Sequence, residues 1–238
     1  MLADEGRSTA HSGALRPDLH LPSEWLSALV RFIGDMLPAW RDDPARPVET
    51  SETRLTARLC ARLNSLCHHT PGWDFLQFRQ EEPDESVGGR AIDLVSAPAG
   101  QILWISGRAY NEYQSLIPIE CKRLPTPVDP KRDSREYLYS DKSSTGGVQR
   151  FKAGAHGAAH PRAAMIGYVQ DKDVAHWREQ IDAWIDDLIA APVTGWSHGD
   201  RLALASHDTV QRVATLASKH ERMGELAPIL IDHLWIEM

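Results

Sequence analysis

The sequence has few cysteines, no long apolar run and no excess of positive charge. Its 238 residues include only 3 cysteines, an odd number that argues against a disulfide framework and favours buried thiols in a reducing compartment. No window approaches the ~18 consecutive apolar residues of a membrane span, and residues 1–20 lack the basic flank and apolar run of a secretory signal. We therefore expect a cytoplasmic protein without a membrane partner.

The formal net charge of -7 argues against a protein that binds nucleic acid by bulk charge, because neutralising phosphates requires lysine and arginine. Residues 120–152 nevertheless carry eight basic and five acidic residues, a local excess of positive charge in an acidic chain. This segment is either a basic face or a solvated loop of mixed charge.

The length and composition fit one globular domain with appendages. Hydrophobic residues make up 42% of the chain and charged residues 25%, close to the average for soluble domains. Residues 1–22 are polar and aperiodic, which predicts a flexible N-terminal tail followed by a single domain over residues 23–238.

Hydrophobic periodicity predicts an α/β fold. Helical spacing runs from Ser23 until Pro38 and again from residues 50–51 until Pro71, and Asp173 opens a third amphipathic helix that Pro192 ends. Shorter helices are expected near residue 137 and from residue 147, with a polar helical segment between the last two strands. Alternating or β-branched runs predict strands over residues 74–80, 90–97, 101–110, 116–124, 163–170, 201–206 and 229–237. This order predicts a mixed central sheet with helices on both faces.

One pair of charged residues lies at the end of an apolar strand. In Glu120-Cys121-Lys122, strand alternation places the carboxylate and the ammonium on the same face. Asp129 and Lys131 have the same acid-x-Lys spacing, but they fall in a proline-rich loop that does not fix their direction. The rigid strand therefore makes Glu120 and Lys122 the candidate pair.

Two further acids lie where apolar residues are expected. Asp93 interrupts an apolar strand, and burying a lone carboxylate is costly unless it is paired or bound to a metal. Lys122 or a divalent cation would satisfy it. Glu52 lies two helical turns before Leu59 and so shares the core-facing stripe of its helix, either as a site residue or as a favourable acid in the first turn.

A helix acid, a strand aspartate and then Glu-x-Lys on the next major strand resemble the PD-(D/E)XK nuclease superfamily. The resemblance covers residues 50–170 and implies a restriction-endonuclease-like α-β-β-β-α-β core, with an extra N-terminal helix and C-terminal helix and strands. It implies a Mg²⁺-dependent deoxyribonuclease, with Mn²⁺ as a substitute, that hydrolyses phosphodiester bonds.

The resemblance also implies individual roles. Asp93, Glu120 and the backbone carbonyl of Cys121 would ligate the metal, Lys122 would orient or deprotonate the attacking water, and Glu52 would be an auxiliary acid. Gln149 is expected to contact the water or a phosphate. The basic residues expected to bind substrate are Arg123, Arg150 and Lys152.

The partner implied is DNA, in restriction, repair or defence against mobile elements, with a homodimer or a protein partner as further possibilities. The alternative is a noncatalytic nucleic-acid-binding or interaction protein on a decayed nuclease fold, in which Asp93, Glu120 and Lys122 form only an ion network.

Other site patterns are weaker. Cys67-His68-His69 lacks the second ligand pair of a zinc site and fits a helix C-terminus better. Arg150 and His156 have a spacing similar to that of HEPN ribonucleases, but that class is all-helical and this chain has a strong strand signal.

Overall fold

The computed structural model describes residues 22–85, 90–142 and 146–238, so the predicted tail over residues 1–22 lies almost entirely outside the described residues. The helices are α1 (Pro22–Arg41), α2 (Glu52–His69), α3 (Gly147–Lys152) and α4 (Val174–Ala190), with a 3-10 turn η1 (His198–Asp200). The strands are β1 (Leu76–Pro83), β2 (Ala91–Pro98), β3 (Leu103–Ile105), β4 (Arg108–Tyr110), β5 (Ile117–Leu124), β6 (Arg162–Val169), β7 (Ala203–Asp208), β8 (Val213–His220) and β9 (Ile229–Glu237).

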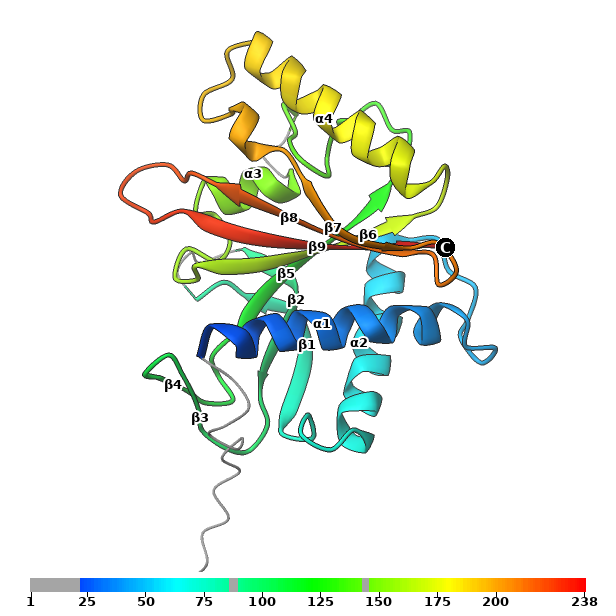
Figure 1. Cartoon of the computed structure of the whole chain (residues 1–238), viewed down its shortest axis with the longest axis vertical. Helices are drawn as coiled ribbons and strands as arrows, with labels where there is room; N and C mark the ends of the chain where they lie inside the picture. The colour runs from blue at the N-terminus through cyan, green and yellow to red at the C-terminus, as the bar shows by residue number, and fades with distance from the viewer. Residues whose placement is uncertain (1–21, 86–89, 143–145) are drawn as a thin grey trace, which may run out of the picture.

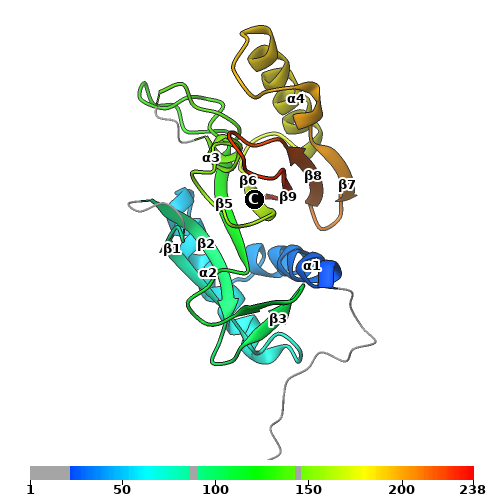
Figure 2. The ribbon, with the colours of Figure 1, turned by 90° about the vertical axis from the view of Figure 1, so that its left-hand side faces the viewer.

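Seven strands form one mixed sheet in the order β1-β2-β5-β6-β9-β8-β7. The centre, β5-β6-β9, is parallel, and both flanks are antiparallel. Helices α1 and α2 cover one face and α3 and α4 the other (Figures 1 and 2). Each face has its own apolar core, one built around Leu29, Leu59 and Ile119, the other around Phe151, Ile181 and Trp235. The predicted α/β class with a mixed, two-sided sheet is confirmed.

The parallel arrangement of the central strands explains why β6 has an apolar run and why β5 begins with apolar residues. Both faces of this part of the sheet are covered, so nearly every side chain of β5 and β6 is buried. An ionisable residue on β5 therefore needs a partner.

No helix among the described residues is both long and apolar enough to cross a bilayer.

Four local predictions were wrong. Helix α1 does not end at Pro38 but continues to Arg41, because Trp40 is buried and the Arg41 guanidinium donates to the carbonyls of Gln211 and Glu237 at 2.7 and 3.2 Å. The strand expected over residues 101–110 is instead the hairpin β3–β4. Its turn contains Ser106 and Gly107, both with positive φ.

The other two errors concern segments with buried polar side chains. The segment near Tyr137 forms hydrogen-bonded turns rather than a helix, and the Tyr137 hydroxyl hydrogen-bonds to His233 Nδ1 at 2.7 Å. The expected polar helix between the last two strands is strand β8. Its inward positions include Ser218 and His220, whose polarity conceals the strand alternation.

Candidate active site

Asp93 and Glu120 lie where strands β2 and β5 begin to separate. The last paired residues of the antiparallel β2–β5 ladder are Leu94 and Ile119. One residue further on, the Asp93 carboxylate accepts the backbone N–H of Cys121 at 2.9 Å. The acid therefore occupies a mid-strand position because its side chain replaces a ladder partner.

Lys122 brings the predicted acids together. Its Nζ lies 3.3 Å from Glu52 Oε1, 3.4 Å from Asp93 Oδ2 and 3.4 Å from Glu120 Oε2. The ammonium also donates to the Cys121 carbonyl at 3.1 Å, the oxygen predicted to be a metal ligand. The three carboxylates come from α2, β2 and β5, so tertiary packing alone assembles the cluster.

Glu52 lies at the start of α2 and is also a member of the cluster around Lys122. It is the first residue of α2, where a carboxylate favours the positive end of the helix dipole. Its second oxygen accepts the backbone N–H of Arg123 at 3.0 Å, so Glu52 fastens the start of α2 to the end of β5.

Glu120 is completely buried and has a basic side chain at each oxygen. His156 Nδ1 lies 2.5 Å from Oε1, and Arg150 lies 3.0 Å from Oε2. Burial by itself would raise the pKa of Glu120, but Lys122, the His156 hydrogen bond and Arg150 outweigh it and lower the pKa to about 2. Glu120 is therefore a firmly ionised group at the centre of the site.

The pKa values of Asp93 and Lys122 are both raised, but by different causes. Burial and the charge of Glu120 raise the pKa of Asp93 to about 6, against the opposing effect of Lys122. Burial would lower the pKa of Lys122, but Asp93, Glu120 and Glu52 raise it above its ordinary value. Lys122 therefore stays protonated and can supply positive charge, whereas it is poorly suited to deprotonate a water.

A small pocket opens the site toward solvent. It has a volume of about 40 Å³, enough for a single water or ion, and is lined by Glu52, Thr53, Thr56, Gln80, Glu81 and Asp93. The Asp93 and Glu52 side chains are 28% and 21% exposed, while that of Glu120 is 0% exposed. Solvent therefore reaches the cluster around Lys122 on the side of Asp93 and Glu52.

Sequence reasoning missed Gln80 and Glu81. Neither lies near the Glu-x-Lys pattern, and Glu81 belongs to an acidic run. The register of the β1–β2 hairpin is the feature that could have identified them. These strands pair antiparallel with Gln80 opposite Leu94 and Glu82 opposite Ile92, so Glu81 comes to lie across from Asp93.

The predicted basic and amide residues divide into two groups. Arg150 contacts Glu120, and Arg123 lies beside Glu52, with its guanidinium donating to the Thr50 carbonyl at 2.8 Å. Gln149 and Lys152 lie elsewhere. The Gln149 side-chain oxygen accepts the N–H groups of residues 140 and 146, and Lys152 is buried in an ion pair with Asp200.

The donor chemistry suits a hard cation, although no metal cage is preformed. Within the described ranges, no three His, Cys, Asp or Glu side chains are grouped so that they could hold a metal ion by themselves. Mg²⁺ needs only one or two protein carboxylates, because waters and substrate phosphates complete its shell. Asp93 and Glu52, both facing the small pocket, fit that requirement, whereas Glu120 is already saturated by basic partners.

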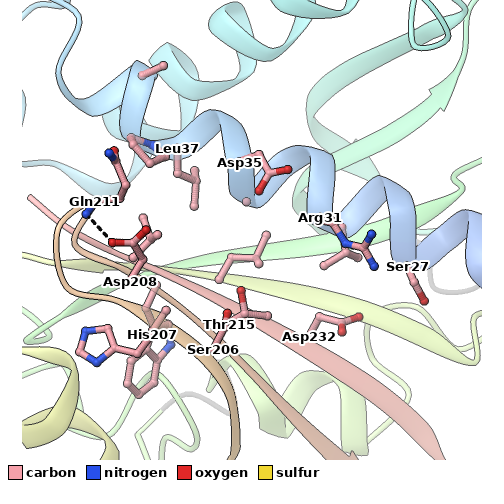
Figure 3. Close-up of a pocket in the computed structure, with 18 of the residues that line it drawn as sticks. Ser27, Arg31, Asp35, Leu37, Ser206, His207, Asp208, Gln211, Thr215 and Asp232 are labelled. Carbon is pink, nitrogen blue, oxygen red and sulfur yellow. Dashed lines mark hydrogen bonds between the residues drawn. The ribbon is translucent and has the colours of Figure 1, made fainter.

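A much larger pocket lies between α1 and strands β7–β9. It has a volume of about 900 Å³. Figure 3 shows Arg31 and Asp35 projecting from α1 on one side and Thr215 and Asp232 on the sheet. None of the predicted site residues lines it, so this pocket is separate from the cluster around Lys122.

Comparison with known proteins gives no assignment. No family model matches the chain, and neither the curated proteins nor the solved structures contain a match. The functional argument therefore depends on the site itself.

Proposed function

We propose that this chain is a metal-dependent nuclease that hydrolyses phosphodiester bonds of DNA, with a site of the PD-(D/E)XK kind. The observation that carries the proposal is the convergence of carboxylates from α2, β2 and β5 on the Lys122 ammonium at 3.3 to 3.4 Å. This cluster lies at the separation of two strands and opens through a small pocket lined by oxygen donors.

The order of elements supports the same proposal. The sequence α2, β1, β2, β5, α3, β6 follows the α-β-β-β-α-β order of that superfamily, with the β3–β4 hairpin inserted between β2 and β5. The inserted hairpin forms its own two-stranded sheet and does not interrupt the main one.

Each residue then has a role that its surroundings permit. Asp93 and Glu52 would hold Mg²⁺, which when bound acidifies water and offsets phosphate charge. Lys122 keeps its proton and places positive charge beside the reacting phosphate. Glu120, held by His156 and Arg150, fixes the position of the Lys122 ammonium rather than meeting solvent.

The alternative is a noncatalytic nucleic-acid-binding or interaction protein on the same fold. One observation favours it, namely that both oxygens of Glu120 are engaged by basic side chains, as in a structural ion network. The alternative predicts binding without strand cleavage.

Cleavage assays with different metals and nucleic acids separate the two readings. Duplex DNA, single-stranded DNA and RNA are incubated with the purified protein in Mg²⁺, Mn²⁺ or EDTA. We expect DNA strands to be cut in either metal and to remain intact in EDTA, with Glu52→Gln requiring more metal for the same rate. Intact DNA in both metals would favour the noncatalytic reading.

A further inference from the structure

A second large pocket is lined in part by α3, the helix from which Arg150 contacts Glu120. It has a volume of about 870 Å³ and is bounded by α3, the loop after α4 and the β8–β9 turn. Figure 1 shows these segments on the same side of the sheet. The Met223 N–H donates to the Lys152 carbonyl at 3.0 Å and so fastens the β8–β9 turn to α3.

One wall of this pocket is aromatic and held in place. The rings of Tyr139 and Trp196 meet edge to face, with their centroids 6.4 Å apart. The Lys152 ammonium lies 4.9 Å from the centre of the Trp196 ring. Lys152 is itself buried against Asp200, which also accepts from His220. The indole therefore forms part of a fixed surface suited to contact with another flat ring.

The same pocket has a fixed hydrogen-bond donor. The Gln149 side-chain oxygen accepts the N–H groups of Ser140 and Gly146 at 3.0 and 3.2 Å, which sets the orientation of its amide. The Gln149 Nε2 donates to no group in the described part of the chain. An oriented amide beside aromatic rings, whose N–H groups donate to none of the described residues, suits the acceptor edge of a nucleobase.

The pocket and the nuclease site share elements. Arg150, which contacts Glu120, lies between Gln149 and Lys152 on α3. The exposed Arg90 also lines the pocket and lies three residues before Asp93, immediately before strand β2. A guanidinium at this position suits a backbone phosphate between the pocket and the metal site.

We propose that this pocket takes one unstacked base of the nucleic acid whose backbone is cut at the metal site proposed for Asp93 and Glu52, beside Lys122. The inference rests on the proposed nuclease function for the position of the backbone. The base would stack on Trp196 and accept a hydrogen bond from Gln149, and extracting a base is easiest from a single strand or a distorted duplex.

The test measures binding in EDTA, where the proposed cleavage does not occur. The probes are a short labelled single-stranded oligonucleotide and an abasic strand of equal length, which has the phosphates without the bases. We expect the wild type to prefer the strand with bases, and Trp196→Leu to reduce that preference roughly tenfold with little change for the abasic strand. Gln149→Glu keeps an oxygen for both backbone N–H groups and removes the donor, so the preference falls again in a folded protein.

The matched control is Trp104→Leu, since Trp104 is 72% exposed on the separate β3–β4 hairpin. It should leave both affinities unchanged. A preference that persists in Trp196→Leu and Gln149→Glu, or that disappears in Trp104→Leu, overturns the proposal. The proposal is also overturned if a free mononucleotide displaces the labelled oligonucleotide as well as an unlabelled oligonucleotide does, because the pocket would then not require a base held within a strand.

These results separate the pocket from the nuclease. A protein that shows the base preference but cuts nothing in Mg²⁺ or Mn²⁺ keeps the pocket and loses the proposed chemistry. A protein that cuts DNA while Trp196→Leu binds like wild type keeps the chemistry and loses the pocket.

Discussion

Glu81 faces Asp93 across the β1–β2 ladder at the position where their pairing is interrupted. Gln80 pairs with Leu94 and Glu82 with Ile92, but no pairing joins the two acids between them. Glu81 has a φ of 48°, in the left-handed region that side chains with a Cβ adopt at a cost of about 1 kcal/mol. Strained backbone of this kind is concentrated at functional sites.

The strain at Glu81 leads to the first prediction. In Glu81→Gly the relief of the left-handed conformation offsets the entropy lost by glycine, so the free energy of unfolding stays within about 1 kcal/mol of wild type. The metal concentration that gives half-maximal cleavage should rise, because a carboxylate is lost from the small pocket. Urea unfolding and a Mg²⁺ titration measure the two effects.

The neighbouring Glu82 provides the control. It pairs regularly with Ile92 and forms an ion pair with Arg79 at 3.1 Å. Glu82→Gly should lower the free energy of unfolding by about 1 kcal/mol and leave the metal requirement unchanged. Equal metal requirements in the two glycine variants would remove Glu81 from the site.

Asp93→Asn should stabilise the metal-free protein. Burial and the charge of Glu120 raise the pKa of Asp93 to about 6 from its ordinary value of 3.8. The folded state therefore holds this proton more tightly than the unfolded state, and the free energy of unfolding falls as the pH rises from about 4 to 6. Asparagine avoids that loss, for a gain on the order of 1 kcal/mol at pH 7 in EDTA.

Added metal should reverse the order of stabilities. Mg²⁺ that binds only the folded wild type raises its melting temperature, while Asp93→Asn should respond little. Thermal melts in EDTA and in Mg²⁺ measure both effects. A metal-free Asp93→Asn protein that melts below wild type would favour the structural ion network.

Glu120→Gln should have the opposite effect on stability. It leaves Lys122 and Arg150 without their shared buried carboxylate, and breaking such a buried pair costs about 3 kcal/mol. The pKa of Glu120 is lowered to about 2 from 4.5, so its stabilising contribution is complete above pH 4.5 and disappears as the pH falls toward 2. Urea unfolding at several pH values should show a shallower acid limb in the variant.

Glu179→Gln is the matched change, because Glu179 is exposed on α4. It should stay within about 0.5 kcal/mol of wild type at every pH. A Glu120→Gln protein as stable as this control would show that the His156–Glu120–Arg150 contacts contribute little to folding.

The parts of the fold with strong local patterns were predictable. Helix α4 follows its apolar stripe, and Asp173 caps it by accepting the His176 N–H at 2.8 Å, as the sequence indicates. The apolar run of β6 was recognisable because both faces of this strand are covered. Asp93 was identifiable because its acidity conflicts with its apolar strand.

The parts set by tertiary contacts were not predictable in the same way. Strand β8 conceals its alternation because Ser218 and His220 are buried in a hydrogen-bonded network rather than an apolar one. The sequence predicts that Lys152 contacts substrate, but in the structure Lys152 forms an ion pair with Asp200, which lies far along the chain. A single sequence shows that a residue is charged, but not which distant residue pairs with it.

The comparison of two lysines with the same local spacing tests the central claim most directly. Lys122 lies within 3.4 Å of three carboxylates, whereas Lys131, in Asp129-Pro130-Lys131, is exposed on a loop. We predict that Lys122→Met lowers the rate of Mg²⁺-dependent DNA cleavage by about a hundredfold, while Lys131→Met cleaves at the wild-type rate. Cleavage by Lys122→Met at the wild-type rate would contradict the assignment of this cluster as the active site.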